Sequence, residues 1–341
     1  MFSFKSFLLK IQKNLLLILL IGSFLVNCVL GYFYFKKQEN QVSSFPKIKV
    51  ATALPTVQNL LEGYVKAHLK QYNIDLEVVY LPNKYLQTDE LLANGEVDAK
   101  LDAHVHHLNT FNNSHKPQED NKLTFIQPVY LAKFSLFAKQ KGNIKTVEDL
   151  KNLKNDRKKL KILMIKDNFQ QTLSLLLLEQ LGIIKKKTQI PSDDIFALKR
   201  GDFKSCDGFP EIEYETAELL QLKNKFQNDN YDLCLQYPTI MGASNDFLSI
   251  GSITPPKELN NTIYSYTISL VARKNNEDSL KIKILQEFLK QEEIIKQAQK
   301  KPNGPFTNLE NYYMIPKKDI DPLSVIIKNN YLGKTFSQET L

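Results

Sequence analysis

Residues 100–115, KLDAHVHHLNTFNNSH, hold four of the chain's five histidines. These are His104, His106, His107 and His115, and Asp102 lies two residues before the first of them. On a strand, Asp102, His104 and His106 would face one side, and three such ligands can hold Zn²⁺. On a helix, His104 and His107 would share a face instead. The spacing leaves three interpretations open: a metal site, the polar wall of another pocket, and a solvated polar turn.

Catalytic signatures are missing from the sequence. It contains no Gly-x-Ser-x-Gly, no Walker A motif and no His-Glu-x-x-His, and we identify no nucleophile–base pair. No second group of His and Asp at ligand spacing supports the histidines of residues 100–115. We therefore expect a protein that is not an enzyme and that needs no cofactor or metal.

Length and composition fit a folded body outside the nucleic-acid-binding classes. The chain has 341 residues, 43% of them hydrophobic and 24% charged, which is enough for one large domain or two ordinary ones. The net charge is +8, and lysines are densest in KNLKNDRKKLK, residues 151–161. No zinc knuckle or aromatic RNA-binding signature accompanies them, so we interpret this segment as a solvated surface and expect no nucleic-acid partner.

An uncharged segment near the N-terminus predicts a membrane anchor. Residues 14–35, NLLLILLIGSFLVNCVLGYFYF, lie between lysines on both sides. About 20 apolar residues span a hydrocarbon core of roughly 30 Å as a helix. The basic leader favours an N-terminus in the cytoplasm, which places the C-terminal body on the extracellular side of the cell membrane. A cleaved signal peptide is an alternative to this transmembrane helix.

The three cysteines raise two further questions. Cys28 lies in LVNC, which is similar to a degenerate lipobox, although Asn27 replaces the small residue expected there. Lipidation of Cys28 is therefore a second way to anchor the chain. Cys206 and Cys234 could form a disulfide outside the membrane, or Cys234 in YDLCLQY could be a buried thiol.

From Pro46 onward, strand and helix patterns alternate. Strands are expected over 47–54, 74–81 and 96–102, with helices over 56–72 and 85–95 between them. A second α/β unit follows, and long strands over 122–139 and 263–274 join the two. The division predicted is an anchor and linker over 1–45, a first lobe over 46–134, a second lobe over 135–250, and a return to the first lobe over 251–341. A cleft between two such α/β lobes is the expected ligand site.

Four segments in a fixed order resemble one known family. They are NKYLQTDELLANGEVDAKLDAHVHHL (83–108), FIQPVYLAKFSLFAKQKGNIKTVEDLKNL (125–153), LSLLLLEQLGII (173–184) and YTISLVARKNNED (266–278). They resemble the NlpA-type methionine-binding lipoproteins, the substrate-binding components of amino-acid ABC importers. The resemblance covers residues 47–300. It implies an α/β, two-lobed, type II periplasmic-binding-protein-like fold, and an ABC permease and ATPase as partners.

The resemblance also implies a set of ligand contacts. Where the family has an arginine for the ligand's α-carboxylate, this chain has Leu173, and leucine cannot replace a bidentate arginine. Lys166 is a candidate to meet an anion instead. The positions that match the family's pocket are Asn83, Tyr85, His104, Tyr130, Gln170 and Tyr237.

The sequence thus predicts an extracellular, membrane-anchored solute-binding protein. Its ligand would be a methionine-like amino acid or a short peptide. Two alternatives remain: a surface interaction protein or adhesin on the same scaffold, and a zinc receptor using Asp102, His104 and His106.

Overall fold

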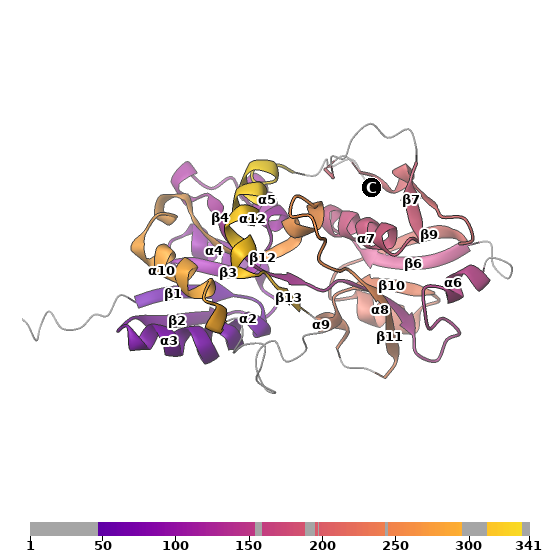
Figure 1. Ribbon diagram of the computed structural model, residues 1–341, viewed down its shortest axis with the longest axis horizontal. Helices are drawn as coiled ribbons and strands as arrows, with labels where there is room; N and C mark the ends of the chain where they lie inside the picture. Colours follow the sequence, from indigo (N-terminus) through magenta and orange to yellow (C-terminus); the bar gives the residue numbers. More distant parts are fainter. Residues whose placement is uncertain are drawn as a thin grey trace, which may run out of the picture.

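Two β-sheets organise the chain in the computed structural model (Figure 1). The structure describes residues 47–153, 159–187, 195–196, 198–242, 245–294 and 312–335. One sheet has six strands in the order β13-β4-β12-β3-β1-β2, and the other has five in the order β11-β5-β10-β6-β9. We call the six-stranded sheet with its helices the first lobe, and the five-stranded sheet with its helices the second lobe. The two lobes confirm the predicted two-lobed α/β architecture.

The first lobe begins with the predicted alternation of strands and helices. Its elements up to the crossing are β1 (Lys47–Thr52), α2 (Pro55–Leu60), a π-helical turn (Leu61–Val65), α3 (Lys66–Gln71), β2 (Asp75–Tyr80), α4 (Tyr85–Ala93), β3 (Ala99–Ala103), α5 (Val105–His115) and β4 (Leu123–Ala132). β1 lies between β2 and β3 and is parallel to both, as crossover helices require.

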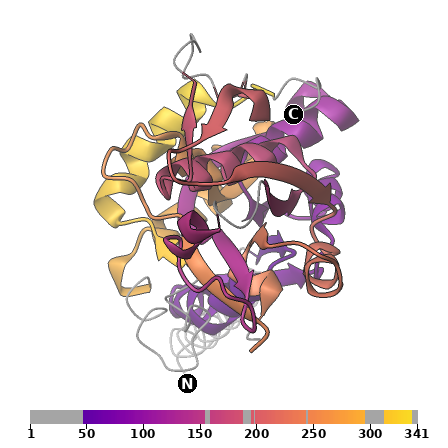
Figure 2. The same ribbon diagram turned by 90° about the vertical axis from the view of Figure 1, so that its right-hand side faces the viewer.

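The second lobe comes from one stretch of chain between two crossings. Its elements are β5 (Ser135–Lys139), α6 (Asp149–Asn152), β6 (Lys159–Ile165), α7 (Asn168–Gln180), β7 (Ile184–Lys186), β8 (Phe203–Ser205), β9 (Glu211–Ala217), α8 (Leu222–Asn228), β10 (Leu233–Gln236), α9 (Pro238–Met241) and β11 (Phe247–Ser252). β7 and β8 pair with each other as a separate two-stranded sheet. Figure 2 shows this lobe facing the viewer.

The return segment completes the first lobe. It contains a 3₁₀ helix (Thr262–Tyr266), β12 (Thr267–Arg273), α10 (Leu280–Leu289), β13 (Tyr312–Met314) and α12 (Lys317–Asn330). β12 inserts between β3 and β4 and is antiparallel to both. α12 packs against β4, and Figure 2 shows it along one side of the molecule in yellow. β13 and α12 form the C-terminal part of this return segment.

The crossings differ in detail from the predicted long strands. The run over 122–139 is two strands in different sheets, and the break falls at Lys133 and Phe134. Pro128 lies inside β4 opposite Ser269, at an irregularity of the register. The second long strand begins only at Thr267, because Asn261 caps the preceding 3₁₀ helix by accepting a hydrogen bond from the N–H of Ile263 (3.0 Å).

The predicted anchor and the lipobox lie outside the described residues, since both fall before Lys47. Among the residues that the structure describes, no helix is long and apolar enough to cross a membrane. The disulfide interpretation is wrong, because Cys206 and Cys234 are both free thiols. Cys234 is buried in β10, and burial raises the pKa of its thiol. The exact domain boundaries stay a prediction.

Candidate functional site

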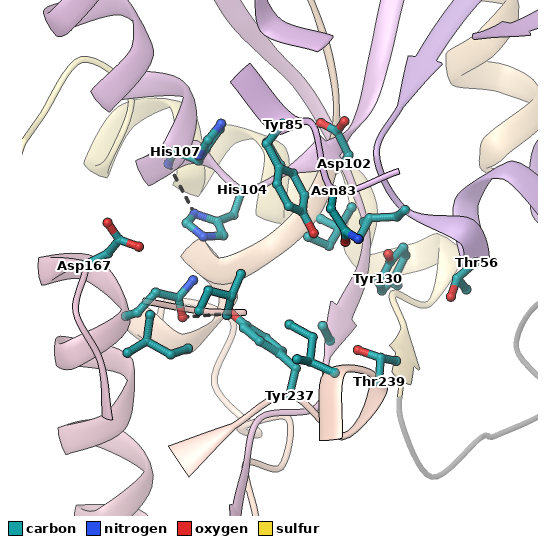
Figure 3. Close-up of a pocket in the computed structure, with 18 of the residues that line it drawn as sticks. Thr56, Asn83, Tyr85, Asp102, His104, His107, Tyr130, Asp167, Tyr237 and Thr239 are labelled. Carbon is teal, nitrogen blue, oxygen red and sulfur yellow. Dashed lines mark hydrogen bonds between the residues drawn. The ribbon is translucent and has the colours of Figure 1, made fainter. Parts of the chain in front are cut away.

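A cavity of about 300 Å³ lies between the two lobes (Figure 3). Both lobes and the return segment contribute to its wall, which is mainly apolar and aromatic. All six residues that the resemblance singled out line this cavity: Asn83, Tyr85, His104, Tyr130, Gln170 and Tyr237. Their contact with a ligand stays a prediction, but the fold brings them together from four separate parts of the chain.

The wall is built where strands end and helices begin. Tyr85 is the first residue of α4, and Gln170 lies in the first turn of α7. His104 directly follows β3, and Tyr237 directly follows β10. Asn83 adopts a left-handed backbone with φ of 59°, which asparagine tolerates better than most residues. These positions follow the general rule that ligands in α/β sheets bind beyond the carboxyl ends of the strands.

The histidine segment is a helix and its cap, not a strand. β3 ends at Ala103, and His104 is the N-cap of α5, where its Nδ1 accepts a hydrogen bond from the N–H of His107 (3.3 Å). Asp102, His104 and His106 therefore do not alternate along one strand face. His106 instead pairs through Nε2 with the Ser265 hydroxyl (2.7 Å). Figure 3 shows His104 directed into the cavity.

Burial keeps two of these histidines neutral. It places the pKa of His104 well below its usual value, and it lowers the pKa of His106 to about 3. The His104 ring packs edge-on against Phe169 of the second lobe, at 5.0 Å between centroids. No group of three or more His, Cys, Asp or Glu side chains within the described ranges could hold a metal ion. The structure does not support the zinc interpretation.

Asp102 belongs to a buried ion network beneath the cavity. Lys100 is fully buried between Asp89 and Asp102, and its ammonium lies 2.8 Å from Oδ1 of Asp102. Oδ2 of Asp102 accepts hydrogen bonds from the N–H of Ala53 (2.8 Å) and the hydroxyl of Thr88 (2.9 Å). Because each charge has a close partner, the network is tolerated inside the first lobe.

The pKa values in this network show the balance between burial and pairing. Burial opposes the ionised form of Asp89, but Lys100 and His107 outweigh it and lower the pKa of this carboxyl. Burial likewise opposes the charge of Lys100, and the two aspartates outweigh it and raise the pKa of the ammonium. The Nε2 atom of His107 lies 2.8 Å from Oδ2 of Asp89, which links the network to the cavity wall.

The second-lobe wall is held by hydrogen bonds between its own side chains. The Tyr237 hydroxyl donates to Oε1 of Gln170 (2.9 Å), and its ring packs edge-on against Phe134 at 5.0 Å. Tyr266, beneath the wall, donates to the carbonyl of Phe169 (2.8 Å). Burial raises the pKa of Tyr237, so its hydroxyl stays protonated and can donate at neutral pH.

The family's carboxylate-binding position, Leu173, and the alternative candidate, Lys166, both lie outside the cavity lining. Leu173 is buried in the core behind the wall. Lys166 is exposed and pairs with Glu218 at 3.1 Å, so the expectation that it meets an anion in the cavity is not supported. None of the described residues that line the cavity is a lysine or an arginine.

Sequence reasoning missed several cavity residues. Tyr312, in β13, packs edge-on against Tyr130 at 5.2 Å, and its hydroxyl lies 2.8 Å from that of Thr56. Nothing in the C-terminal tail marks it as a site residue. Asp167 was detectable, because an aspartate directly before an apolar helix is a typical N-cap at the end of a strand. Thr56 and Thr239 follow prolines that begin helices, a signal for helix starts but not for a site.

Comparison with known proteins decides the relationship. A model of the NlpA lipoprotein family matches residues 48–197. Over these residues the chain is similar to the NlpA lipoproteins. The predicted resemblance is thereby confirmed. A curated NlpA-type relative, the methionine-binding lipoprotein MetQ of Bacillus subtilis strain 168, is 26% identical over 263 residues, covering 75% of this chain and 85% of MetQ.

Solved structures of lipoproteins and binding proteins share the fold. A YaeC-family lipoprotein from Enterococcus faecalis is 19% identical with a TM-score of 0.58, covering 79% of this chain and 98% of its own. A periplasmic substrate-binding protein of an ABC transporter from Coxiella burnetii is 18% identical with a TM-score of 0.58, covering 79% of this chain and all of its own, 100%. The Bacillus and Coxiella proteins are named for binding, and the prediction that the chain is not an enzyme is confirmed.

Proposed function

We propose that the protein is the substrate-binding component of an ABC importer and that it binds one small solute between its lobes. The observation that carries the proposal is the cavity itself, lined from both lobes by aromatic and polar side chains. The name of the Bacillus relative favours a methionine-like amino acid, and a short peptide is the other candidate. The Coxiella structure, named as an ABC transporter component, favours a permease and an ATPase as partners.

The size and lining of the cavity suit a small, partly apolar ligand. Its volume is at the lower end of the roughly 300–1,000 Å³ that ligand pockets occupy. The rings of Tyr85, Tyr130 and Phe169 offer apolar surface, and the Tyr237–Gln170 pair offers polar atoms. Hinge closure about the two crossings would bring these walls onto the solute.

The proposed location is the extracellular face of the cell membrane. Its basis is the uncharged segment over residues 14–35 together with the relationship to lipoproteins. The anchor is either that segment as a transmembrane helix or a lipid on Cys28. Mass spectrometry of the intact protein from membranes distinguishes the two, because an acyl-modified Cys28 adds the mass of its lipid and a helix adds nothing.

A ligand screen tests the binding function. A ligand that binds only the folded state adds RT ln(1 + [L]/Kd) to its stability, about 2.7 kcal/mol at a hundredfold excess over Kd. We expect at least one amino acid, dipeptide or amino-acid amide to raise the melting temperature of the full-length protein. Native mass spectrometry of the freshly purified protein would show a retained solute.

A matched pair of variants shows whether a hit occupies the cavity. Tyr85→Ala removes an aromatic wall and should weaken binding several-fold, since each buried aromatic contact contributes on the order of 1 kcal/mol. Tyr72→Ala removes the same side chain from an exposed site outside the cavity and should leave binding unchanged. A flat screen with no retained solute would contradict the proposal and favour an interaction protein.

A further inference from the structure

The charged side chains around the cavity are mostly negative. Asp102 and Asp167 line it, whereas no lysine or arginine does so in the described part of the chain. His104, which also lines the cavity, is neutral because burial lowers its pKa. Among the described lining residues, a ligand therefore meets the carboxylate of Asp167 and no fixed cation.

The first-lobe side of the cavity carries an excess negative charge. Asp89 and Asp102 share a single buried lysine, Lys100, so one carboxylate charge exceeds the ammonium. Only His107, whose Nε2 contacts Asp89, could offset it by taking up a proton. Asp102 borders the cavity beside Tyr85 (Figure 3), but its side chain is fully buried and paired with Lys100, so its charge acts on a ligand only from behind the wall. Its charge, after burial, contributes to raising the pKa of Tyr85 to about 12.

The second-lobe side carries Asp167, whose carboxylate is not used within the protein. Asp167 is the N-cap of α7, yet its side chain accepts no capping hydrogen bond, unlike most aspartates at this position. It forms no ion pair or side-chain hydrogen bond with any described residue. Figure 3 shows it on the same side of the cavity as His104 and His107.

The partial positive charges of the helix N-termini at the cavity do not offset the negative charge of the carboxylates. The N-terminus of a helix acts as roughly half a positive charge and can bind a carboxylate through free N–H groups. At α7 the carboxylate of Asp167 lies on the same terminus and opposes that half charge. At α5 the His104 ring already accepts one of the free N–H groups.

Aromatic faces complete an environment suited to a cation. Tyr85, Tyr130, Phe169, Tyr237 and Tyr312 all line the cavity. Their ring faces attract an organic ammonium group and contribute nothing comparable to a carboxylate.

We propose, as a deepening of the function proposed above, that the solute is an organic cation whose ammonium group lies beside Asp167 and whose carboxyl group is absent or neutralised as an amide or ester. A free α-amino acid would bring its carboxylate into a cavity without a matching cation. Leaving that buried carboxylate unpaired costs more free energy than the other contacts of a small solute contribute.

Matched compounds that differ only in charge test the proposal. For methionine, leucine and phenylalanine we would titrate the full-length protein with the amide, the free acid and the N-acetylated acid in a calorimeter. At about pH 6.5 the α-amine, with a usual pKa near 7.7–8.0, is protonated, so the series runs from cation through zwitterion to anion. We expect the best amide to bind at least about fivefold more tightly than its free acid, and the N-acetylated acid to bind least.

A charge-neutral variant locates the ammonium group. Asp167→Asn keeps the shape of the side chain and should weaken binding of the best amide about two- to fivefold, the range for a solvent-accessible charge pair. Asp229→Asn makes the same change at an exposed site of the second lobe outside the cavity and should leave that affinity unchanged.

The outcomes separate this inference from the proposed function. Free acids that bind as well as their amides, and lose affinity in Tyr85→Ala, overturn the cationic ligand and leave the binding function standing. An Asp167→Asn variant that binds the amide as tightly as the unmodified protein also overturns the inference. Failure of every compound in the series overturns it too, and the wider solute screen then judges the binding function separately.

Discussion

Replacing Lys100 with methionine should destabilise the first lobe more than any exposed lysine change. Lys100 is fully buried and is the only lysine that pairs with Asp89 and Asp102 in the described structure. Methionine fills a similar volume, so the substitution removes the charge and leaves the packing largely in place. Two buried carboxylates then remain without their shared cation.

The expected cost follows from the partners that remain. Breaking a buried ion pair by removing one partner costs about 3–5 kcal/mol. Asp102 keeps its hydrogen bonds from Ala53 and Thr88, and Asp89 keeps its contact with His107. These remaining contacts place the expected loss near the lower limit, about 3 kcal/mol. That is a large part of the 5–15 kcal/mol by which folded proteins are typically stable.

Urea denaturation of the full-length protein measures this loss, and Lys281→Met is the matched control. Lys281 pairs with Asp98 at 2.9 Å, but its side chain is 40% exposed. An exposed pair contributes about 0.2–1 kcal/mol, so the control should shift the midpoint little. Equal shifts in the two variants would refute the argument from burial.

Acid titration gives a second readout of the same network. The pKa of Asp89 is lowered in the folded protein, so its ionised form contributes stability above its unfolded pKa, and that contribution disappears as the pH falls through the folded pKa. Lys100→Met removes the main cause of the lowering. The stability difference from the unmodified protein should therefore be greatest near neutral pH and shrink below about pH 4. A difference that stays constant across this range would show that the loss is not electrostatic.

Three further predictions concern the cavity wall. Tyr237→Phe removes the donor to Gln170 and should lower stability by about 1 kcal/mol, measured by denaturation; an unchanged midpoint would contradict the hydrogen bond. His104→Ala removes the cap of α5 at a cost of about 1 kcal/mol, whereas His104→Asn retains a capping acceptor, so equal losses in both would disprove the capping role. Calorimetry with Zn²⁺ should find no submicromolar site, and such a site lost in both His104→Ala and His106→Ala would restore the zinc interpretation.

Short sequence motifs predict helix ends that are stabilised by neighbouring residues of the chain. Thr146 and Asp149, three residues apart in the spacing of a capping box, form one: the N–H of Thr146 donates to Oδ2 of Asp149 (2.8 Å), and the N–H of Asp149 donates to the Thr146 hydroxyl (3.3 Å). Gly95 and Gly182, predicted to end α4 and α7, adopt φ of 81° and 68°, the left-handed conformation that helix ends favour.

Helix α5 escaped prediction because its support is distant in sequence. VHHLNTFNNSH is rich in His, Asn and Ser, which have weak helix propensity. Its stability comes from burial of Val105, Leu108 and Phe111, and from Asn109, whose amide donates to the carbonyl of Tyr331 (2.7 Å). Tyr331 directly follows helix α12 and lies 222 residues later in the chain, so no local sequence pattern indicates this contact.

The cavity shows the same division. The six residues expected to line the cavity could be named from the sequence because they match positions of a known family. The strand ends near them are clearly indicated by the sequence. Tyr312 belongs to a strand of only three residues, which exists because it pairs with β4. The charges beneath the wall, Lys100 with its two aspartates, could not be recognised as one network, because the pairing depends on how α4 packs against β3.

The position of β12 between β3 and β4 constrains the order in which the newly made chain can fold. All strands of the second-lobe sheet have left the ribosome once Ser252 has emerged, whereas the first-lobe sheet keeps a gap until residues 267–273 arrive and an unpaired edge until residues 312–314 arrive. Domains generally fold as units during synthesis. A chain interrupted before Tyr312 would therefore expose a finished second lobe joined to an incomplete sheet, lacking the last wall of the cavity and open to proteases or to strand exchange with another copy.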